Sequence, residues 1–344
     1  MSSETPQNAQ VPAPHEQLIQ MGTAHWVSKI VYVAAKLGLA DHLAAGPRSA
    51  AELAGVTGTH APSLHRLMRT LASLGLLTEG DAQRFALTPL GAALQTGAPG
   101  SARASVLTLG GPWFVAAFEQ LLYSLETGHT GFEKAMGMPA FDYLAQHPDE
   151  ASLFSETMVG FHGAEPAAVA AAYDFSGLGT LVDVGGATGN MLGAILARHA
   201  GPRGVLFDRP HVVTDAPALL KARGVEARVT IEAGDFFMRV PTGGDAYLLS
   251  HVIHDWNEEQ CLTLLGHCRK ALTPNGRLLI VEMVLPDGDT PHPGKILDMV
   301  MLAVPGGQER TASEYSTLLG KAGFRVLQVV PTASAVSIVE AVLA

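Results

Sequence analysis

Hydrophobic positions recur at helical spacing near the start of the chain and as short unbroken runs in its second half. Between about His15 and Leu43 the apolar residues fall on one helix face and its end: Ile19, Trp26, Ile30, Val33, Leu37 and Leu39. From Thr180 onward, helical patterns alternate with apolar runs: "TLVDVGG", "RGVLFD", "RVTIEAGDFF", "DAYLLSHVI" and "GRLLIVEMVL". Such runs are typical of strands buried on both faces, and their alternation with helices predicts a parallel, doubly wound sheet. Two final runs, "GFRVLQVV" and "AVSIVEAVLA", predict a terminal hairpin.

The segment between Ser49 and Gly91 has the pattern of a winged helix. Ser49 and Glu52 have the spacing of a capping box, which starts a short helix over residues 50–54. A second helix is expected from Ala61 until Gly75 stops it. The following "LLTEGDAQRFALTPLG" predicts two short strands around a turn.

A winged helix often binds DNA, so its charge matters. Within residues 47–91 four basic and three acidic side chains give 4 − 3 = +1: Arg48, Arg66, Arg69 and Arg84 against Glu52, Glu79 and Asp81. DNA-binding domains usually carry a clustered basic face, which this balance does not supply. We therefore expect a role in packing or dimerisation.

The patterns divide the chain into four parts. Residues 1–14 are expected to form a disordered tail, 15–100 the winged-helix domain, 101–174 a helical linker, and 175–344 the sheet domain. The linker is rich in aromatic residues and methionine, which favours a wall that closes over an apolar ligand. Trp113 and Phe161 are its candidate substrate contacts.

Composition narrows the class of protein. The 344 residues are only 16% charged, with a net charge of −10, which argues against a surface that coats nucleic acid. Cys261 and Cys268 lie seven apart on one face of an expected helix and are predicted to be core residues. No signal peptide is visible and no apolar stretch reaches the ~18 residues of a membrane helix. We expect a cytoplasmic protein that contacts neither membrane nor nucleic acid.

The glycine-rich loop "VDVGGATGN" is placed to bind a ligand at the end of the first strand of the sheet. It contains Asp183, Gly185, Gly186 and Gly189. A dinucleotide fingerprint needs glycine at its first, third and sixth positions, but counting from Gly185 the third and sixth are Ala187 and Asn190. Because no Walker-type phosphate loop occurs either, a phosphate-binding role is disfavoured.

Carboxylates follow three consecutive strands. Asp183 ends the first strand, Asp208 the second, where a carboxylate typically binds ribose hydroxyls, and Asp235 of "GDFF" the third. Any one of them alone could be a helix cap or a solvated loop residue. Asp235 can accept from an exocyclic amino group, and Phe236 can cover an adenine face. A cofactor with ribose and adenine but without phosphate is S-adenosylmethionine.

The chain resembles the class I S-adenosylmethionine-dependent O-methyltransferases of the plant caffeate and isoflavone type and their bacterial relatives, which act on phenazines, anthracyclines, mitomycins and carotenoids. The matching segments occur in order: "LVDVGGATG", "FDRPHVV", "GDFF", "LLSHVIHDW", "LLIVEMVLP", "LDMVML" and "GGQERTASEY". The resemblance covers almost the whole chain. It implies an α/β fold, with a C-terminal Rossmann-like methyltransferase domain and an N-terminal α-helical winged-helix domain through which two copies form a homodimer.

The resemblance also assigns roles to residues. It implies that His254 is the general base, since a histidine pKa lies near neutrality, and that Glu309 and Glu282 orient its ring. S-adenosyl-L-homocysteine is the implied product, and no metal takes part. The implied cofactor contacts are Asp183, Gly185, Gly186, Gly189, Asp208, Arg209, Asp235, Phe236, Phe237, Ser250, Trp256 and Met158. The implied substrate contacts are His162, Asp255, Asp298, Met299, Met301, Phe161 and Trp113. Trp256 is expected to stack on adenine, and Ser250 stands where plant members often carry lysine.

Four other hypotheses remain open at this stage. His251, His254 and Asp255 could be metal ligands, but the set is incomplete. His254 could be structural. The fold could perform hydroxylation or decarboxylation, as some relatives do. A winged-helix regulator that senses S-adenosylmethionine is the remaining one. The acceptor expected for the main hypothesis is a small aromatic metabolite.

Overall fold

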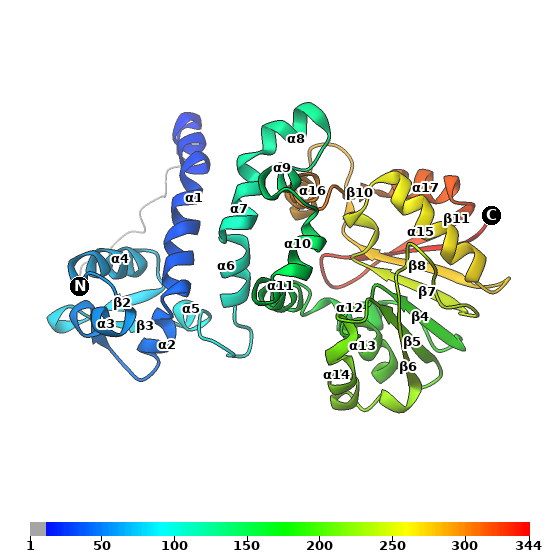
Figure 1. The fold of residues 1–344 in the computed structure, drawn as a ribbon, viewed down its shortest axis with the longest axis horizontal. Helices are drawn as coiled ribbons and strands as arrows, with labels where there is room; N and C mark the ends of the chain where they lie inside the picture. The colour runs from blue at the N-terminus through cyan, green and yellow to red at the C-terminus, as the bar shows by residue number, and fades with distance from the viewer. Residues whose placement is uncertain (1–11) are drawn as a thin grey trace, which may run out of the picture. The chain divides into compact units, whose positions relative to one another are not determined.

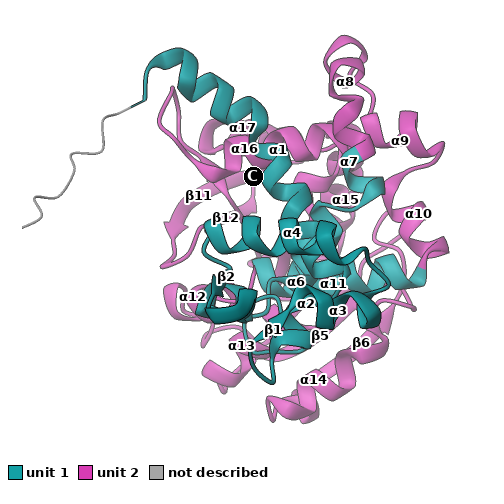
Figure 2. Ribbon diagram, turned by 90° about the vertical axis from the view of Figure 1, so that its left-hand side faces the viewer, with its two compact units in different colours: residues 1–115, 148–161 teal, residues 116–147, 162–344 magenta. Residues whose placement is uncertain are grey.

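A computed structural model describes residues 12–344, which form two compact units. The first unit contains the chain up to Val115 together with Pro148–Phe161, and the second contains Ala116–His147 and His162–Ala344 (Figure 2). The helical region expected over residues 101–174 thus contributes to both units. Of the expected tail, residues 1–11 lie outside the described part of the chain.

The first unit is mainly helical, with a small antiparallel sheet in the order β1-β3-β2. Its elements are α1 (Pro14–Lys36), α2 (Leu39–Leu43), β1 (Arg48–Ser49), α3 (Ala50–Thr57), α4 (Ala61–Ser73), β2 (Leu77–Glu79), η1 (Asp81–Gln83), β3 (Arg84–Leu87), α5 (Pro89–Ala92), α6 (Arg103–Leu109) and α11 (Pro148–Phe161). Helix α7 (Pro112–Glu119) spans the division between the units.

Local chemistry explains where the first unit departs from its pattern. The expected single helix over His15–Leu43 breaks between α1 and α2 because Gly38 adopts φ +62°, a left-handed conformation that favours glycine. Helix α3 continues past Gly55 and ends at Gly58, whose φ of +64° makes it the C-cap. Ser49 and Glu52 form the expected capping box, and a third strand, β1, joins the two predicted ones.

The second unit is built around a seven-stranded sheet (Figure 1). Its strands are β4 (Thr180–Val184), β5 (Arg203–Asp208), β6 (Val229–Ala233), β7 (Ala246–Ser250), β8 (Arg277–Glu282), β11 (Phe324–Pro331) and β12 (Ser337–Leu343), with a small parallel pair of β9 (Val284–Leu285) and β10 (Arg310–Thr311). Its helices are α8 (Leu121–Thr127), α9 (Gly131–Met136), α10 (Ala140–Gln146), α12 (Glu165–Ala172), α13 (Asn190–Arg198), α14 (Ala216–Ala222), α15 (Glu258–Ala271), α16 (Pro293–Ala303) and α17 (Ala312–Lys321). Three 3₁₀ turns complete the list: η2 (Val213–Asp215), η3 (Glu226–Arg228) and η4 (Ile253–Asp255).

The strand order β11-β12-β8-β7-β4-β5-β6 places β4 near the middle of the sheet. Strands β6, β5, β4, β7 and β8 are parallel, whereas β12 runs antiparallel to both β8 and β11. The parallel sheet and the terminal hairpin expected from the sequence are confirmed. The carboxyl ends of the parallel strands therefore meet at one edge, where the loops after β4, β5, β6 and β7 come together.

Each face of this sheet is covered by helices, so alternate strand residues enter different cores. Val182 and Leu249 face a core that includes Cys261 and Cys268 of α15 and Tyr315 of α17. The opposite core contains these neighbouring strand and helix residues: Leu181, Leu248, Val169, Ile195 and Leu220. Both cysteines are free and buried, which confirms that they are core residues.

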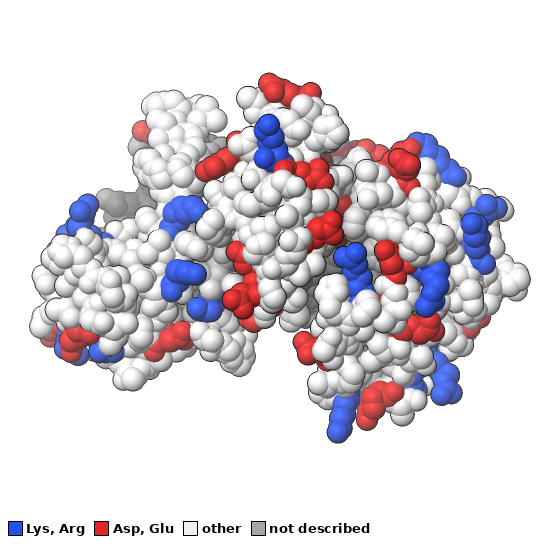
Figure 3. Space-filling model, viewed as in Figure 1, with Lys and Arg blue, Asp and Glu red and all other residues white. Residues whose placement is uncertain are grey.

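One face of the molecule carries no cluster of basic side chains (Figure 3). On the side drawn in Figure 3, lysine and arginine side chains are scattered among acidic and uncharged ones. In the first unit Arg84 forms an ion pair with Glu52 at 3.0 Å, which further reduces the free positive charge of the winged helix. No helix in the described residues is both long and apolar enough to span a membrane.

Candidate active site

His254 and Glu309 form a buried imidazole–carboxylate pair. His254 lies in η4, directly after β7, and Glu309 immediately precedes β10. His254 Nδ1 lies 2.6 Å from Glu309 Oε1, with side chains only 8% and 0% exposed. Since a carboxylate only accepts, the neutral ring carries its proton on Nδ1, and in that form the other ring nitrogen, Nε2, can accept a proton.

Glu282 supports the same turn but does not touch the ring. Its Oε1 accepts from the backbone N–H of Val252 at 3.2 Å and of His254 at 3.1 Å, and its Oε2 accepts from the Tyr315 hydroxyl. Whether Glu282 also orients the imidazole ring, whose nitrogen lies within 4.8 Å of its carboxylate, stays a prediction. Glu282 fixes the backbone that carries the imidazole, because the end of β8 lies beside the loop after β7.

The electrostatics of the site make His254 a strong base. Burial lowers the pKa of His254, but the carboxylates of Asp255, Glu309 and Glu282 outweigh burial and raise its pKa to about 10. The near-neutral pKa expected from the sequence does not apply to the folded protein. Asp255 Oδ1 lies 3.6 Å from His254 Nε2, and burial raises the pKa of Asp255 to about 6 against the opposing effect of His254.

Three further predicted substrate residues lie on α16. Asp298 accepts a hydrogen bond from the backbone N–H of Glu309 at 2.8 Å. It therefore fixes the backbone of Glu309, the partner of His254. Met301 is buried and Met299 half-buried. Asp255, Asp298 and the base therefore form one neighbourhood. Met301 joins it through its carbonyl oxygen, which accepts from the backbone N–H groups of Gly306 and Gly307, at 2.8 and 3.2 Å, in the loop before Glu309.

The glycine loop after β4 encloses an unpaired carboxylate. Asp183 is completely buried, and neither of its oxygens has a hydrogen-bond partner of standard geometry among the described residues. Burial and the nearby charge of Asp208 raise its pKa to about 7, although the backbone N–H of Leu192 acts against them. A Cβ added at Gly186 would lie 2.5 Å from the Asp183 carboxyl group. Gly185 adopts φ +72°, and a Cβ there would lie 2.8 Å from Val252. The loop thus needs glycine at both positions.

Asp208 fixes the shape of this loop from the neighbouring strand. Its Oδ2 accepts from the backbone N–H of Ala187 at 2.9 Å, and its Oδ1 accepts from the backbone N–H of Arg209 at 2.7 Å. Ala187 itself has φ +49°, so this bond helps to hold a left-handed residue. The Arg209 side chain is exposed, and Gly189 is the N-cap of α13.

Aromatic side chains gather beside the same edge of the sheet. The Phe236 and Phe237 rings each meet Trp256 edge to face, with centroids 5.9 and 4.7 Å away, and Phe141 of α10 lies 5.5 Å from Trp256. Trp256 Nε1 is buried without a partner among the described residues. Asp235 Oδ1 accepts from the Phe237 N–H at 2.8 Å, and half-buried Ser250 ends β7.

The candidate cofactor residues fit S-adenosylmethionine in their donor and acceptor chemistry. The buried carboxylate of Asp183 and the indole N–H of Trp256 are unpaired polar groups, and native proteins rarely leave such groups without a partner. At Gly185 and Gly186 the loop after β4 has no room for a side chain, because Val252, Asp183 and Leu206 fill the space that a Cβ would take.

Three predicted contacts belong to the first unit. Trp113 is buried there against Phe114 and Phe154, with ring centroids 5.5 and 6.4 Å apart. Phe161, at the end of α11, is 56% exposed, and Met158 is half-buried on the same helix. The structure thus does not bring these three residues into the unit that carries His254.

The structure contains a second imidazole–carboxylate cluster, which the sequence predicted only in part. Glu165 of α12 is buried, and its Oε2 lies 2.9 Å from His162 Nδ1 and 2.8 Å from His251 Nε2. His162 was expected to contact substrate and His251 was considered only as a metal ligand, whereas Glu165 had no assigned role. The signals available were the spacing of His162 and Glu165, one helical turn apart, and the position of His251 three residues before His254.

These groups also bear on the metal hypothesis. The ligand atoms of His162, Glu165 and His251 lie within 4.8 Å of one another, as do those of His254, Glu282 and Glu309. The structure therefore does not assemble the set His251, His254 and Asp255. In both observed groups each carboxylate already accepts hydrogen bonds from N–H or O–H donors of the chain.

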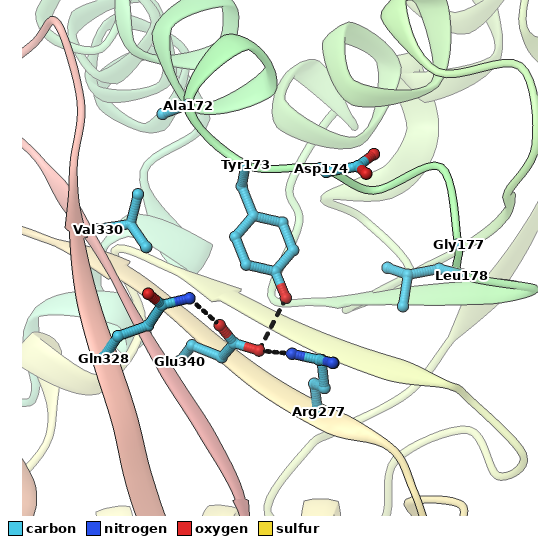
Figure 4. A pocket seen from close by; sticks show the side chains of 9 residues that line it. All are labelled: Ala172, Tyr173, Asp174, Gly177, Leu178, Arg277, Gln328, Val330 and Glu340. Carbon is cyan, nitrogen blue, oxygen red and sulfur yellow. Dashed lines mark hydrogen bonds and ion pairs between the residues drawn. The ribbon is translucent and has the colours of Figure 1, made fainter.

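A separate cavity of about 530 Å³ lies at the opposite edge of the sheet (Figure 4). Arg277, the first residue of β8, lines it beside Glu340, which accepts from Tyr173 at 3.0 Å and from Gln328 at 2.7 Å. The carboxylate is thus fully paired. Since ligands of parallel sheets bind beyond the carboxyl ends of the strands, this amino-end cavity is distinct from the site around His254.

Comparison with known proteins identifies the family. Residues 19–97 match the O-methyltransferase dimerisation domain, and residues 118–325 match the O-methyltransferase domain. The chain is 45% identical to the phenazine O-methyltransferase of Lysobacter antibioticus over 324 residues, which are 94% of this chain and 95% of that protein. It is 36% identical to the phenazine-1-carboxylate N-methyltransferase of Pseudomonas aeruginosa, over 92% of this chain and 94% of that one.

The fold agrees with this assignment. The crystal structure of an O-methyltransferase from neocarzinostatin biosynthesis, in complex with S-adenosylmethionine and 2-hydroxy-5-methyl naphthoic acid, matches with a TM-score of 0.83 and 32% identity. That match covers 92% of this chain and 96% of the other. The resemblance seen in the sequence is confirmed, and the chain belongs to the family of S-adenosylmethionine-dependent O-methyltransferases.

Proposed function

We propose that this enzyme methylates a hydroxyl oxygen on a small aromatic metabolite, with His254 as the general base. The observation that carries the proposal is the 2.6 Å contact between His254 Nδ1 and Glu309, which commits Nδ1 and leaves Nε2 to receive a proton. Glu282 and Asp298 hold the backbone of these two residues. Catalysis then depends on an imidazole ring whose orientation is fixed before the acceptor binds.

The residues of the loops after β4, β5 and β6 would hold the cofactor. Asp183 and the glycines approach it from one side, Asp208 suits ribose hydroxyls, and Asp235 suits the adenine amino group. When bound, S-adenosylmethionine supplies an electrophilic methyl group and leaves as S-adenosylhomocysteine. The chain's own part is to exclude water, align the acceptor oxygen and remove its proton.

The strength of the base suits a phenolic acceptor. A phenol has a pKa of about 10, similar to tyrosine. The carboxylates around His254 raise its pKa to about 10, so the transfer of a proton from a bound phenol to Nε2 is nearly balanced in free energy. An amine nitrogen that already has a lone pair needs no such base, which favours oxygen over nitrogen as the acceptor atom.

The acceptor class and the assembly follow from the relatives. The phenazine and naphthoic acid names of similar proteins support a flat, fused-ring or substituted aromatic acceptor. The match to a dimerisation domain over residues 19–97 supports a homodimer built through the first unit. The cytoplasmic location expected from the sequence stays a prediction.

The test is methyl transfer by the His254→Ala variant. Purified protein is mixed with methyl-labelled cofactor and a panel of phenols, hydroxyphenazines and hydroxynaphthoates. Loss of a positioned base should lower kcat by roughly 10²–10⁴-fold while cofactor affinity, measured by calorimetry, stays within about threefold. His60→Ala, in the first unit, is the matched control and should keep full activity.

Two results would contradict the proposal. Equal activity of His254→Ala and the wild type on an accepted substrate would exclude His254 as the base. A hydroxylated or decarboxylated product without S-adenosylhomocysteine would show altered chemistry on this fold.

A further inference from the structure

A neutral acceptor nitrogen is buried beside the base and has no hydrogen-bond partner in the part of the chain that the structure describes. His251 Nε2 lies 2.8 Å from Glu165 Oε2, and the same oxygen lies 2.9 Å from His162 Nδ1. Burial raises the pKa of Glu165, but hydrogen bonds from the two histidines lower it to about 2. Glu165 is therefore a carboxylate that can only accept, so His251 Nε2 carries a proton.

The tautomer of His251 follows from this contact. Burial lowers the pKa of His251 to about 4, although the hydrogen bond that His251 donates to Glu165 opposes this, so the ring is neutral at pH 7. With its proton on Nε2, the neutral ring has a lone pair on Nδ1. His251 Nδ1 is buried and has no hydrogen-bond partner among the described residues. A buried acceptor without a partner is costly, which indicates that a ligand supplies the missing donor.

The position of His251 shows which ligand can reach it. Its ring centroid lies 5.2 Å from that of His254, at an interplanar angle of 50°. The ring centroid of His162, its second aromatic neighbour, lies 3.8 Å away. His251 also adopts φ +52°, a conformation that a non-glycine residue keeps only when its surroundings impose it. The strained backbone thus fixes this ring next to the group that takes the proton of the acceptor.

We propose that His251 Nδ1 accepts a hydrogen bond from an amino or hydroxyl group that neighbours the reacting hydroxyl on the acceptor ring. The inference rests on the proposed function, because it places the reacting hydroxyl at His254 Nε2. Two vicinal donors of one aromatic ring can then reach two adjacent imidazoles. Glu165 acts as the positioning residue that sets the His251 tautomer, and His162 packs against the ring.

This role makes His251 a selectivity residue. The proposed acceptors have a donor, such as an amino or second hydroxyl group, next to the position that is methylated. An acceptor with a methyl group in that place has the same size but leaves Nδ1 unpaired. The structure therefore predicts a preference that depends on one hydrogen bond and not on the volume of the substituent.

The experiment measures binding of two matched probes, 3-amino-4-hydroxybenzoate and 4-hydroxy-3-methylbenzoate. Calorimetry at pH 7.5 uses the full-length protein loaded with S-adenosylhomocysteine, in buffer with a chelator that removes adventitious metal. The wild type should bind the amino probe about 10-fold more tightly, as expected for one buried hydrogen bond. This comparison needs no variant, so it does not depend on the folding of a mutant.

The variant His251→Asn then tests the residue, because asparagine tolerates the left-handed backbone at this position. It should bind both probes with equal affinity while keeping the wild-type affinity for S-adenosylhomocysteine. His60→Asn is the control and should keep the preference.

Three outcomes would overturn the inference: no preference in the wild type, including no binding of either probe; an unchanged preference in His251→Asn; or a loss confined to the cofactor, which would assign Nδ1 to that ligand. These results are separate from a failure of the proposed function. That failure appears as methyl transfer that does not need His254, whereas the probe preference is a binding measurement that requires no turnover.

Discussion

The ring of His254 lies among more negative charge than one imidazolium can balance. Asp255, Glu282 and Glu309 all raise its pKa, while Arg310, the buried cation nearby, donates to the carbonyl oxygens of Ile253 and Gln308 and to no carboxylate. Below the pKa of about 10, His254 holds a proton and cannot accept another. The reaction that requires neutral His254 should therefore accelerate as pH rises toward 10.

Glu309→Gln tests this charge effect. The substitution removes one negative charge but keeps a side-chain oxygen of similar reach, so the pKa of His254 falls. The pH at which kcat/KM levels off should move down by about one unit or more. The plateau value of kcat should fall about 10-fold, because an imidazole of lower pKa is a weaker base toward the acceptor proton. The measurement is a pH–rate profile on one accepted substrate.

Glu258→Gln is the matched control, because Glu258 is exposed and forms an ion pair with Lys321 at 2.7 Å, away from His254. Its profile should coincide with that of the wild type. A Glu309→Gln profile that keeps its inflection while the rate falls would show that Glu309 acts by shape and not by charge.

At the scale of elements, the loop between β4 and α13, which we propose holds the cofactor, has glycine where packing leaves no room for a side chain. The Asp183 carboxyl group and the Leu206 side chain fill the space beneath Gly186, so a Cβ there would lie 2.5 Å from each. Real Cβ atoms do not approach other atoms so closely, and the loop would have to move. The same glycines that suggested a ligand loop in the sequence are thus required by packing.

Gly186→Ala should weaken S-adenosylhomocysteine binding at least 10-fold, because a displaced loop loses its backbone contacts to the ligand. Calorimetry with the purified variant measures the change. Gly266→Ala on α15 is the matched control, since no atom lies within 4 Å of an added Cβ and its φ is not left-handed. That variant should bind normally and unfold at the same or higher urea concentration. Unchanged affinity in Gly186→Ala would contradict the loop assignment.

At the scale of the whole molecule, the first unit exposes apolar side chains that a single copy does not cover. Helix α1 alone presents several large ones, with exposed fractions between 41% and 71%: Leu18, Ile19, Met21, Trp26, Val27 and Val33. Contiguous exposed apolar surface is typical of interfaces between proteins. The low charge of the chain, 16% of its residues, agrees with extensive buried area between subunits.

The homodimer is tested by sedimentation at micromolar concentration. The wild type should have about twice the chain mass of 36.0 kDa. The double variant Leu18→Glu/Trp26→Glu should sediment as a monomer, because charge on this face is costly to bury. Leu327→Glu, on β11 of the second unit and 42% exposed, should stay dimeric. A wild-type monomer would remove the basis of the proposed assembly.

Much of the fold could be predicted because its signals are local. The buried runs from Leu181, Leu206, Leu248 and Leu279 marked parallel strands, and Ser49 with Glu52 marked a helix start, since each depends on neighbouring residues. Motif spacing likewise indicated Asp183, Asp208, Asp235, His254 and Glu309 as site residues before any contact was known.

Tertiary structure decided what those residues do to one another. Glu282 holds the backbone N–H of His254, and Glu165, far from His251 in sequence, sets the tautomer of His251. Met158, Phe161 and Trp113 lie in the first unit, although the aromatic composition of their region suggested one wall. By itself the sequence determined the elements, the family and the cofactor loop, because helical and strand periodicity and motif spacing are local. The pKa of His254 and the unpaired nitrogen of His251 depend on burial and on distances between residues far apart in the chain, which only folding brings together.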